Sequence, residues 1–407
     1  MSLWKTVALG EATTITGGGT PRRNNPDFYG GTIPWVTPKD MKSWEIHSAQ
    51  VNITHSGLKN SAARLVPPNS VLIVVRSGVL KHTIPVALNR VPVAINQDMK
   101  ALRCSGTFDP DFLARFIKAQ SSEILQWVRA TTADNFPIDM LKQLRVPVPP
   151  LSEQRRIADV LDRAEALRAK RRAALSQLDI LTQSIFLDLF GDPASNPMGW
   201  PRMALGDLIV AGPQNGLYKP SADYGLGTPI LRIDAFYDGV VTKLGALKRV
   251  RLSEKEHELY ELRSDDIIVN RVNSMEYLGK SALIPKLDEP TVFESNMMRF
   301  EVDGQRVEPC YVVEFLQSMF VKAQILTAAK HAVNQSSINQ QDVQGFRINV
   351  PPIAMQREFR RRVTAVEKLE ATQRASLSGM DMLFAVLQHR AFRGELFGAS
   401  AAKRNAT

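Results

Sequence analysis

Cysteine and histidine are scarce in this sequence, which has two cysteines and six histidines among 407 residues. Cys104 and Cys310 lie far apart and form no C-x-x-C pair. This excludes a disulfide framework and a four-cysteine zinc site, and it fits a reducing compartment. The histidines have neither HExxH nor another paired-ligand spacing, so we predict no metal site. They are His47, His55, His82, His257, His331 and His389.

Long apolar runs are also missing. No run reaches the roughly 18 residues that a transmembrane helix needs. The first residues lack the basic flank and apolar core of a signal peptide. We therefore expect a soluble, cytoplasmic protein with no membrane partner.

Motifs for nucleotide binding are absent. Gly279-Lys280-Ser281 resembles the end of a P-loop, but Ser274 stands where the first glycine is needed. The Gly17-Gly18-Gly19 run lacks the GxGxxG spacing that admits a pyrophosphate. We interpret that run as a recognition or surface loop.

Motifs for catalysis on DNA are absent as well. An adenine methyltransferase needs Asn, Asp or Ser before a Pro-Pro pair and an aromatic residue after it, whereas Val148 and Val350 precede the pairs here. Metal-dependent nucleases need carboxylates near a lysine, and no E-x-K triplet occurs. No serine or cysteine lies in a nucleophile motif. The sequence therefore predicts a binding protein that is not itself an enzyme.

The composition is that of a folded globular protein, with 44% hydrophobic and 23% charged residues. A chain of 407 residues exceeds what one hydrophobic core usually serves, so we expect at least two domains. The formal net charge is +10, which favours a polyanionic partner.

The sequence is an internal duplication of a unit of roughly 200 residues. Four anchors recur in the same order at nearly constant separation. They are Trp4 and Leu9-Gly10 with Trp200 and Leu205-Gly206, Asp109-Pro110 with Glu308-Pro309, Pro149-Pro150 and Gln154 with Pro351-Pro352 and Gln356, and LFG at 189–191 with LFG at 396–398.

Each copy ends in a helical stretch. Residues 152–190 contain no Gly or Pro and carry a regular apolar stripe, which predicts one helix of about 58 Å. Residues 353–397 repeat the stripe, interrupted only by Gly379 and Gly394. We expect the two helices to pair with each other. The alternative is two independent helices, each packed on its own domain.

The region before each helix alternates short apolar runs with Gly, Pro and Asn, which is typical of an α/β or α+β domain. We therefore predict two similar globular domains in tandem, separated by two long antiparallel helices that form a coiled coil with pseudo-two-fold symmetry. The predicted segments are a first domain at 1–150, a central helix at 151–190, a linker and second domain at 191–350, a C-terminal helix at 351–398 and a disordered tail at 399–407.

Charge differs between the two globular regions. Residues 1–150 have a net charge of +7, whereas residues 191–350 have −3. Any DNA contact in the second region must therefore come from a local patch. The basic run from Arg168 to Arg172 is typical of a solvated helix face, with a phosphate contact as the alternative.

Loops rich in Arg, Lys, Asn and Gln offer the donors and acceptors that read base edges in the major groove. A solvated surface residue is the alternative for each one taken singly. The DNA-binding candidates in the first half are Arg22, Arg23, Asn24, Asn25, Lys39, Arg76, Lys81 and His82. Those in the second half are Gln214, Asn215, Lys219, Arg232, Arg271, Asn273, Asn334 and Gln335.

Three motifs together resemble the specificity subunits of Type I restriction-modification enzymes, and the resemblance covers nearly the whole chain. The second copy departs from the first, with Ala354-Met355-Gln356 where the first has Ser152-Glu153-Gln154. The motifs are GGGTPRRNN leading to GGTIPWVTPKDM near the N-terminus, VPPLSEQRRIADVLDRAEALRAKRR at the end of the first half and LFGDPASNPMGWPRMALGDL at the start of the second.

The resemblance implies two target-recognition domains, each reading one half of a split, asymmetric DNA sequence, with the helices setting the spacer. It implies a non-catalytic subunit that recruits two modification subunits, which methylate adenine N6 with S-adenosylmethionine after flipping the base. Restriction subunits would add ATP-driven translocation and cleavage. S-adenosylmethionine, ATP and Mg²⁺ are expected in those partners and no cofactor in this chain.

Two other functions stay open from the residues alone. One is a stand-alone, sequence-specific DNA-binding regulator without enzyme partners. The other is a self-sufficient enzyme, which would need an active site that no motif indicates.

Overall fold

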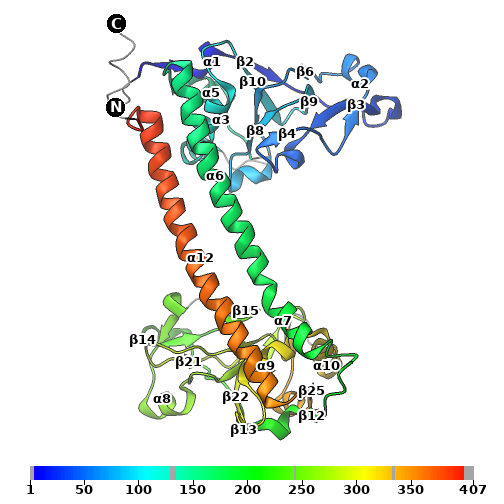
Figure 1. Cartoon of the computed structure of the whole chain (residues 1–407), viewed down its shortest axis with the longest axis vertical. Coiled ribbons are helices and arrows are strands. Elements are labelled where there is room, and N and C mark those ends of the chain that lie inside the picture. The colour runs from blue at the N-terminus through cyan, green and yellow to red at the C-terminus, as the bar shows by residue number, and fades with distance from the viewer. Residues whose placement is uncertain (1–3, 129–133, 243, 332–334, 398–407) are drawn as a thin grey trace. The chain divides into compact units, whose positions relative to one another are not determined.

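Contacts divide the chain into two units, each of which combines one globular region with segments of two long helical regions. Unit 1 comprises Met1–Arg172 and Ala375–Thr407, and unit 2 comprises Ala173–Arg374. The predicted tail at 399–407 lies outside the described residues. The structure, a computed structural model (Figure 1), describes residues 4–128, 134–242, 244–331 and 335–397.

Unit 1 contains a five-stranded sheet in the order β2-β10-β7-β8-β4. Neighbouring strands are antiparallel except β4 and β8, which are parallel. Every residue of the central strand β7 is buried, because the run of Val, Leu and Ile has an apolar layer on each face. The strands are β2 (Thr13–Gly17), β4 (Glu45–Ile46), β7 (Ser70–Val74), β8 (Val86–Asn89) and β10 (Met99–Cys104).

A second sheet of unit 1 has the order β5-β3-β9-β6, and β1 pairs with β11 as a separate ribbon. In the second sheet β3 is parallel to β9 and antiparallel to β5. The strands are β1 (Thr6–Ala8), β3 (Tyr29–Val36), β5 (Asn52–Ile53), β6 (Leu65–Val66), β9 (Val93–Ile95) and β11 (Arg145–Pro147).

Unit 2 has a six-stranded sheet in the order β13-β22-β18-β20-β16-β15, a three-stranded sheet in the order β17-β14-β21 and the ribbon β12-β25. A further small sheet has the order β19-β24-β23. The strands are β12 (Arg202–Ala204), β13 (Ile209–Asn215), β14 (Tyr224–Leu231), β15 (Phe236–Tyr237), β16 (Gly239–Val241), β17 (Lys248–Val250), β18 (Ile267–Asn270), β19 (Val272–Asn273), β20 (Ser281–Leu283), β21 (Val292–Phe293), β22 (Met297–Val302), β23 (Lys330–His331), β24 (Ser336–Ser337) and β25 (Arg347–Asn349).

The two units share one topology. The order β13-β22-β18-β20-β16 repeats β2-β10-β7-β8-β4, with the last pair parallel in both. In the second sheets, β17-β14-β21 repeats β5-β3-β9, whereas β6 has no counterpart among the described strands of unit 2. The equivalent strands β3 and β14 each have a register shift, between Tyr29 and Ile33 and between Tyr224 and Thr228. The prediction of two similar α/β domains in tandem is therefore confirmed.

Short helices cover the sheets. The two acidic-Pro helix starts are confirmed: Asp109 caps α3 by accepting hydrogen bonds from the backbone N of Asp111 and Phe112, and Pro309 begins α9. The helices of unit 1 are α1 (Leu9–Ala12), α2 (His55–Lys59), α3 (Pro110–Ala119), α4 (Ser121–Gln126) and α5 (Ile138–Gln143). Those of unit 2 are α8 (Glu254–Tyr260), α9 (Pro309–Leu316), α10 (Met319–Ala328) and α11 (Gln340–Gly345).

The long helical stretches are α6 (Leu151–Asp179), α7 (Leu181–Phe190) and α12 (Ile353–Arg393). The single helix expected over 152–190 is thus divided at Ile180, which keeps helical dihedral angles (φ −93°, ψ −8°). Gly379 does not interrupt α12, whereas Gly394 follows its end in the left-handed region (φ 83°). No described helix has an apolar stretch long enough to span a membrane.

One buried glutamine ties the start of each long helix to its own domain. Gln154 Oε1 accepts a hydrogen bond from Asp109 N (2.8 Å), and its Nε2 donates to Pro149 O (2.9 Å) and Thr107 O (3.0 Å). Gln356 makes the equivalent bonds in unit 2, with Glu308 N (2.9 Å), Pro351 O (2.7 Å) and Arg306 O (3.4 Å). Both side chains are fully buried. The recurrence of glutamine after each double proline therefore has a structural cause.

The two long helical regions contact each other within each unit. In unit 1, the Arg168 guanidinium of α6 lies over the Phe384 ring of α12 (4.3 Å) and pairs with Asp381 (2.6 Å). In unit 2, Arg374 of α12 pairs with Asp179 of α6 (3.2 Å). The predicted pairing is confirmed, and each helix also packs on its own domain, so both packing modes occur together.

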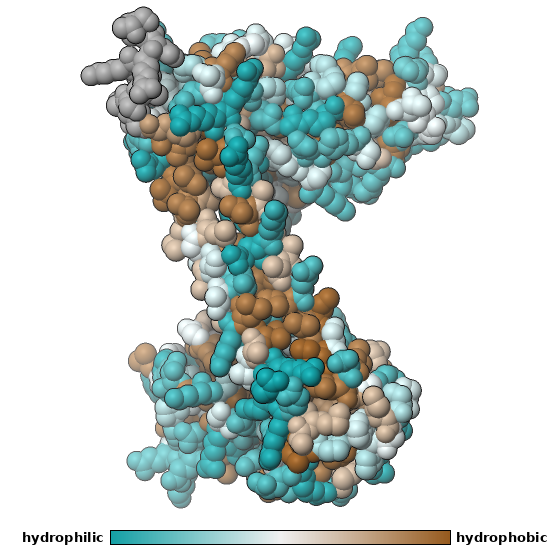
Figure 2. All heavy atoms as spheres, in the orientation of Figure 1, coloured by the Kyte–Doolittle hydropathy of each residue, from teal (hydrophilic) through white to brown (hydrophobic). Residues whose placement is uncertain are grey.

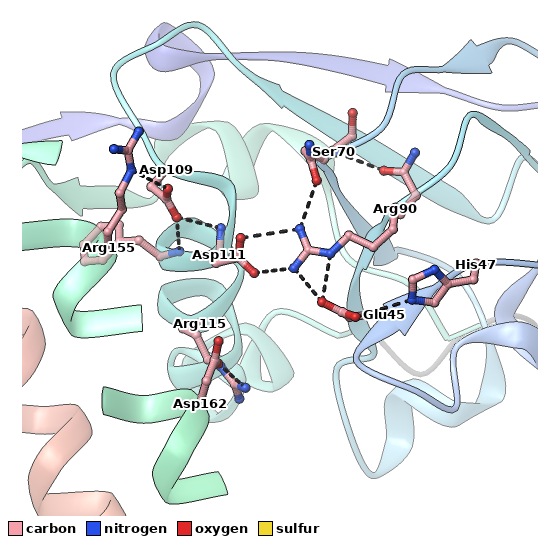
Figure 3. A network of polar contacts seen from close by, with 12 residues as sticks. Glu45, His47, Ser70, Arg90, Asp109, Asp111, Arg115, Arg155 and Asp162 are labelled. Carbon is pink, nitrogen blue, oxygen red and sulfur yellow. Dashed lines mark hydrogen bonds and ion pairs between the residues drawn. The ribbon is translucent and has the colours of Figure 1, made fainter. Parts of the chain in front are cut away.

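Charged residues join the sheet of unit 1 to its helices (Figure 3). Arg90, which follows β8, donates to Glu45 of β4 (2.6 Å) and to Asp111 of α3 (2.6 Å). The hydrogen bond from Arg90 lowers the pKa of Glu45. Arg115 on α3 pairs with Asp162 on α6 and lies over the Trp44 ring (3.9 Å). The network thus links strand, short helix and long helix.

Aromatic rings occupy the corresponding junction of unit 2. Tyr311 of α9 is fully buried between Phe186 (5.5 Å between ring centroids) and Phe190 (4.8 Å) of α7. Phe359 of α12 contacts the same two phenylalanines, at 5.6 and 5.7 Å. The Tyr311 hydroxyl donates to Asn349 O (2.6 Å), which satisfies its one polar group.

Candidate nucleic-acid interface

In unit 1, several loops meet where β2, β3, β7 and β9 end. Because β3 and β9 are parallel, their ends lie together, with Val36 opposite Ile95. Gly19 N donates to Ile95 O (3.0 Å), and Val75 N donates to Asp98 O (2.9 Å). We call this set of loops the unit 1 loop edge; it comprises residues 18–25, 37–41, 75–83 and 96–98.

A glycine permits the close approach of two of these loops. A Cβ atom on Gly18 would lie 1.9 Å from Ile95 O. The equivalent Gly216 of unit 2 is under the same restriction, with Glu294 O at 2.2 Å from the position of its Cβ. The glycine run predicted as a recognition or surface loop therefore lies in the loop edge, and packing explains its central glycine.

Arg76 is the candidate that the unit 1 loop edge holds most firmly. Its guanidinium pairs with the Asp98 carboxylate (2.6 Å), which also accepts a hydrogen bond from Asn96 Nδ2 (2.8 Å). The Arg76 side chain is still 45% exposed. An arginine that is oriented by a carboxylate and open to solvent suits bidentate recognition of a base edge.

The other unit 1 candidates lie on the same loop edge and differ in their exposure and in their contacts. Lys81 is 62% exposed, and its Nζ lies 3.6 Å from the buried Asp134 carboxylate. The Asn25 side chain accepts a hydrogen bond from Asp27 N (3.1 Å) and so caps a turn. The exposed candidates are Arg22, Arg23, Asn24, Lys39 and His82.

Unit 2 has an equivalent edge where β13, β14, β18 and β21 end. Leu217 N donates to Phe293 O (2.8 Å), and Arg271 N donates to Asn296 O (2.8 Å). Ser295 N donates to Leu217 O (2.9 Å). We call this set of loops the unit 2 loop edge; it comprises residues 216–223, 232–235, 271–280 and 294–296.

Two arginine candidates of unit 2 are held in this edge. Arg232 Nε lies 3.2 Å from the Glu294 carboxylate, which belongs to the turn after β21, the counterpart of the turn after β9 that holds Asp98 in unit 1. Arg271 donates to Ser295 O (3.1 Å) through its Nη1. Both side chains are partly buried.

Two other candidates are engaged in internal contacts of the domain. Lys219 is only 14% exposed and pairs with Glu256 (2.7 Å), and the hydrogen bonds from this ammonium and from Ser253 lower the pKa of Glu256 to about 2. Gln214 accepts a hydrogen bond from Arg299 Nη2 (2.8 Å) and donates to Leu259 O (2.9 Å). Releasing either side chain to DNA would break these contacts.

The remaining candidates of unit 2 differ in exposure. Asn215 and Gln335 are exposed. Asn273 is partly buried, and its Oδ1 accepts a hydrogen bond from Ser274 N (2.8 Å). Asn334 lies outside the described residues.

Sequence reasoning missed aromatic residues on the unit 2 loop edge, Tyr218 and Tyr277, and Tyr237 of the adjoining strand β15. Tyr218, next to the candidate Lys219, is 78% exposed. Tyr237 and Tyr277 are 40% and 39% exposed, with ring centroids 6.2 Å apart. Lys280 lies over the Tyr237 ring (3.8 Å) and donates to Ile233 O (2.6 Å), so this lysine is not arranged as in a P-loop. Tyrosines within loops between strands were the available signal, since exposed aromatic rings can stack on bases.

Two further features of the described residues concern metal binding and the basic run of α6. Nowhere among them do three His, Cys, Asp or Glu side chains gather so that they could hold a metal ion. In the basic run of α6, Arg168 and Arg172 both pair with Glu165 and Asp381, which is the contact pattern of a helix surface.

The sequence comparisons point to one family. The profile described as "Type I restriction modification DNA specificity domain" matches residues 1–177. The EcoR124I/EcoR124II specificity subunit of Escherichia coli is 38% identical over 167 residues, which span 40% of this chain and 41% of that subunit. The StySPI specificity subunit of Salmonella potsdam is 23% identical over 415 residues, which span 97% and 89% of the two chains.

The structural comparisons agree on the fold. The chain is similar to the crystal structure of the Type I restriction-modification S subunit from M. genitalium, with a TM-score of 0.57, 13% identity and coverage of 96% of both chains. A chain from a structure of the complex assembly and conformational transition of a Type I system has a TM-score of 0.60 and 18% identity, covering 97% and 98%.

Proposed function

Because this chain belongs to the family of Type I restriction-modification specificity subunits, we propose that it directs such an enzyme to a bipartite, asymmetric DNA sequence, each unit reading one half-site. As a specificity subunit it is not itself the catalytic chain. The match to the E. coli EcoR124I/EcoR124II specificity subunit covers only 41% of that subunit, so we propose the target and the partners of this chain.

One observation carries the proposal: a single topology occurs twice, and the two copies present different side chains at the same loop edge. Unit 1 presents Arg76 held by Asp98. Unit 2 presents Arg232 held by Glu294, and the exposed Tyr277 belongs to the same edge. Similar frames with unlike contact residues are what two different half-sites require.

Protein partners fit the surface of the long helices. We propose two modification subunits, which use S-adenosylmethionine, and restriction subunits, which use ATP and Mg²⁺. Apolar side chains lie exposed on the helices of each unit (Figure 2), as expected of a surface that binds protein. They are Leu167, Met382, Leu383 and Val386 in unit 1 and Ile180, Leu181, Leu187 and Leu369 in unit 2.

We propose further that the length of the helical stretches sets the number of base pairs between the half-sites. Four residues inserted midway through 152–190 add about one helical turn. The tolerated spacer should then lengthen while both half-sites stay the same. An altered half-site or an unchanged spacer contradicts this role.

Mapping of methylated adenines tests the function itself. The chain is co-expressed with a Type I modification subunit from the same source in a host without adenine methylation. We expect methylation at one bipartite motif, and exchange of residues 1–145 for those of a relative should change one half-site only. Tight sequence-specific binding by the chain alone, with no modification subunit co-purifying, would instead favour a stand-alone regulator.

A further inference from the structure

A lysine from the helical layer fastens one loop of the unit 2 edge. The loop 271–280 connects β18 to β20 and includes the short strand β19. Lys322 of α10 contacts this loop and donates to Met275 O (3.0 Å), Glu276 O (2.9 Å) and Leu278 O (3.2 Å).

These contacts use the whole donor capacity of the lysine. An ammonium group has three N–H bonds, and each of the three carbonyls accepts one. Three acceptors around one nitrogen define the path of the loop through Leu278. Burial lowers the pKa of Lys322, and the nearby Glu276 carboxylate opposes this shift. A lysine engaged in this way cannot also bind a DNA phosphate without releasing the loop.

Unit 1 fastens the equivalent loop with a lysine from another helix. Lys118 of α3 donates to Ile84 O (2.8 Å) and to Thr83 Oγ1 (3.3 Å), at the end of the loop 75–83. Lys322 lies in α10, so the two units reach the same arrangement from different helices. The loops differ in sequence, whereas the means of attachment recurs.

Both loops carry candidate DNA-reading residues next to the carbonyls and hydroxyl that the lysines bind. The unit 1 loop carries Arg76, Lys81 and His82. The unit 2 loop carries Arg271 and Asn273, together with the exposed Tyr277. A loop that is ordered before binding loses less conformational entropy on the DNA, and its donors meet the base edges in one geometry.

We propose that Lys118 and Lys322 are positioning residues for DNA recognition, each holding the reading loop of its own unit and each affecting one half-site only. This inference rests on the proposed function. It assigns the two loops 75–83 and 271–280 as determinants of sequence specificity, and it assigns the lysines a role through the loop and not through contact with DNA.

The test compares Lys322→Met, Lys118→Met and Lys255→Met in the complex with its modification subunits. Lys255 is an exposed lysine of α8 and serves as the matched control. The probes are duplexes with the motif found by methylation mapping, and variants of it with one base pair changed in one half-site. Binding competition gives the discrimination at each half-site.

We expect Lys322→Met to reduce discrimination about tenfold at one half-site and to leave the other unchanged. Lys118→Met should give the reverse pattern, and Lys255→Met should resemble the wild type. Lys322→Arg keeps the charge but cannot place three donors on the same carbonyls, so it should not restore discrimination. If Lys322→Met does not fold, Lys322→Arg and Lys118→Met carry the test.

Three results overturn the inference while the proposed function stands. They are unchanged discrimination in both methionine variants, equal losses at both half-sites, and full discrimination in Lys322→Arg. A wild-type complex that does not distinguish changes in either half-site contradicts the proposed function itself, so the two failures are separable.

Discussion

The two units join the same sheet to their helices by partly different chemistry. Aromatic rings pack against a long helix in both, since Phe112 and Phe116 of α3 contact Phe392 of α12 in unit 1. In unit 1 the junction also holds charged groups, with Arg90 between Glu45 and Asp111. In unit 2 it holds stacked and edge-to-face rings around Tyr311. The fold therefore requires a junction that is filled and has its polar groups paired, and it accepts more than one set of residues that meets this requirement.

The sixth residue of the corresponding helices shows the same contrast. It is Arg115 in α3, which pairs with Asp162. It is Glu314 in α9, where burial and the Asp238 carboxylate raise the pKa of Glu314 to about 7. At this position unit 1 should therefore respond more to salt, whereas unit 2 should respond more to pH.

The largest effect is expected for Tyr311→Ala in unit 2. Loss of a fully buried ring should lower the free energy of unfolding by about 3–5 kcal/mol. Hydrogen exchange should show faster opening of unit 2 peptides and little change in unit 1. Tyr311→Phe is the control: it keeps the ring, loses the hydrogen bond to Asn349 O and should lose about 1 kcal/mol. Equal opening of both units would contradict the separate roles of the two junctions.

Gln154→Ala and Gln356→Ala should have similar effects, each in its own unit. Either change leaves a buried N–H and buried carbonyls without their partner, so we expect a loss of about 2–3 kcal/mol. Peptides of α6 and α3 should exchange faster in the first variant, and peptides of α12 and α9 in the second. Unequal losses would show that the shared hydrogen-bond pattern is not equally important in the two units.

Arg90→Met should destabilise unit 1 by about 1–2 kcal/mol, because Glu45 and Asp111 lose their common partner while solvent still reaches both. The difference between wild type and variant should shrink as salt is raised. Chemical denaturation monitored by hydrogen exchange at two salt concentrations measures it. Lys286→Met, at an exposed position of unit 2, should leave unit 1 unchanged.

A pH dependence is also expected in unit 2. The pKa of Glu314 is raised from 4.5 to about 7, so the folded protein keeps a proton that the unfolded chain releases. The stability of unit 2 should therefore fall as pH rises between these values and level off above them. Glu314→Gln should flatten this part of the profile of Tm against pH. A profile that is unchanged in the variant would assign the pH dependence to other groups.

Much of the fold could be predicted because its signals are local or repetitive. The duplication, the acidic-Pro helix starts and the long stretches almost free of Gly and Pro are visible in the residues themselves. The division between α6 and α7 at Ile180 was not predicted, because no Gly or Pro marks this position in the sequence. The division is slight, since Ile180 keeps helical dihedral angles.

The candidate site was predicted less completely. Arg76 and Lys81 are exposed on the loop edge, whereas Lys219 and Gln214 are engaged inside the domain. Sequence reasoning could not separate these cases, since a polar residue in a loop looks the same whether its partner is water or a side chain 37 or 85 residues away. It also passed over Tyr218, because only polar donors were considered.

The sequence by itself showed the internal duplication, because the same residues recur in the same order. It also predicted a helix after each copy, because helix propensity, capping and apolar periodicity act over a few neighbouring residues. Tertiary structure alone decided what the paired glutamines bind, which lysine holds which loop and which arginines stay open to solvent. Those outcomes depend on atoms that only the folded chain brings within hydrogen-bond distance.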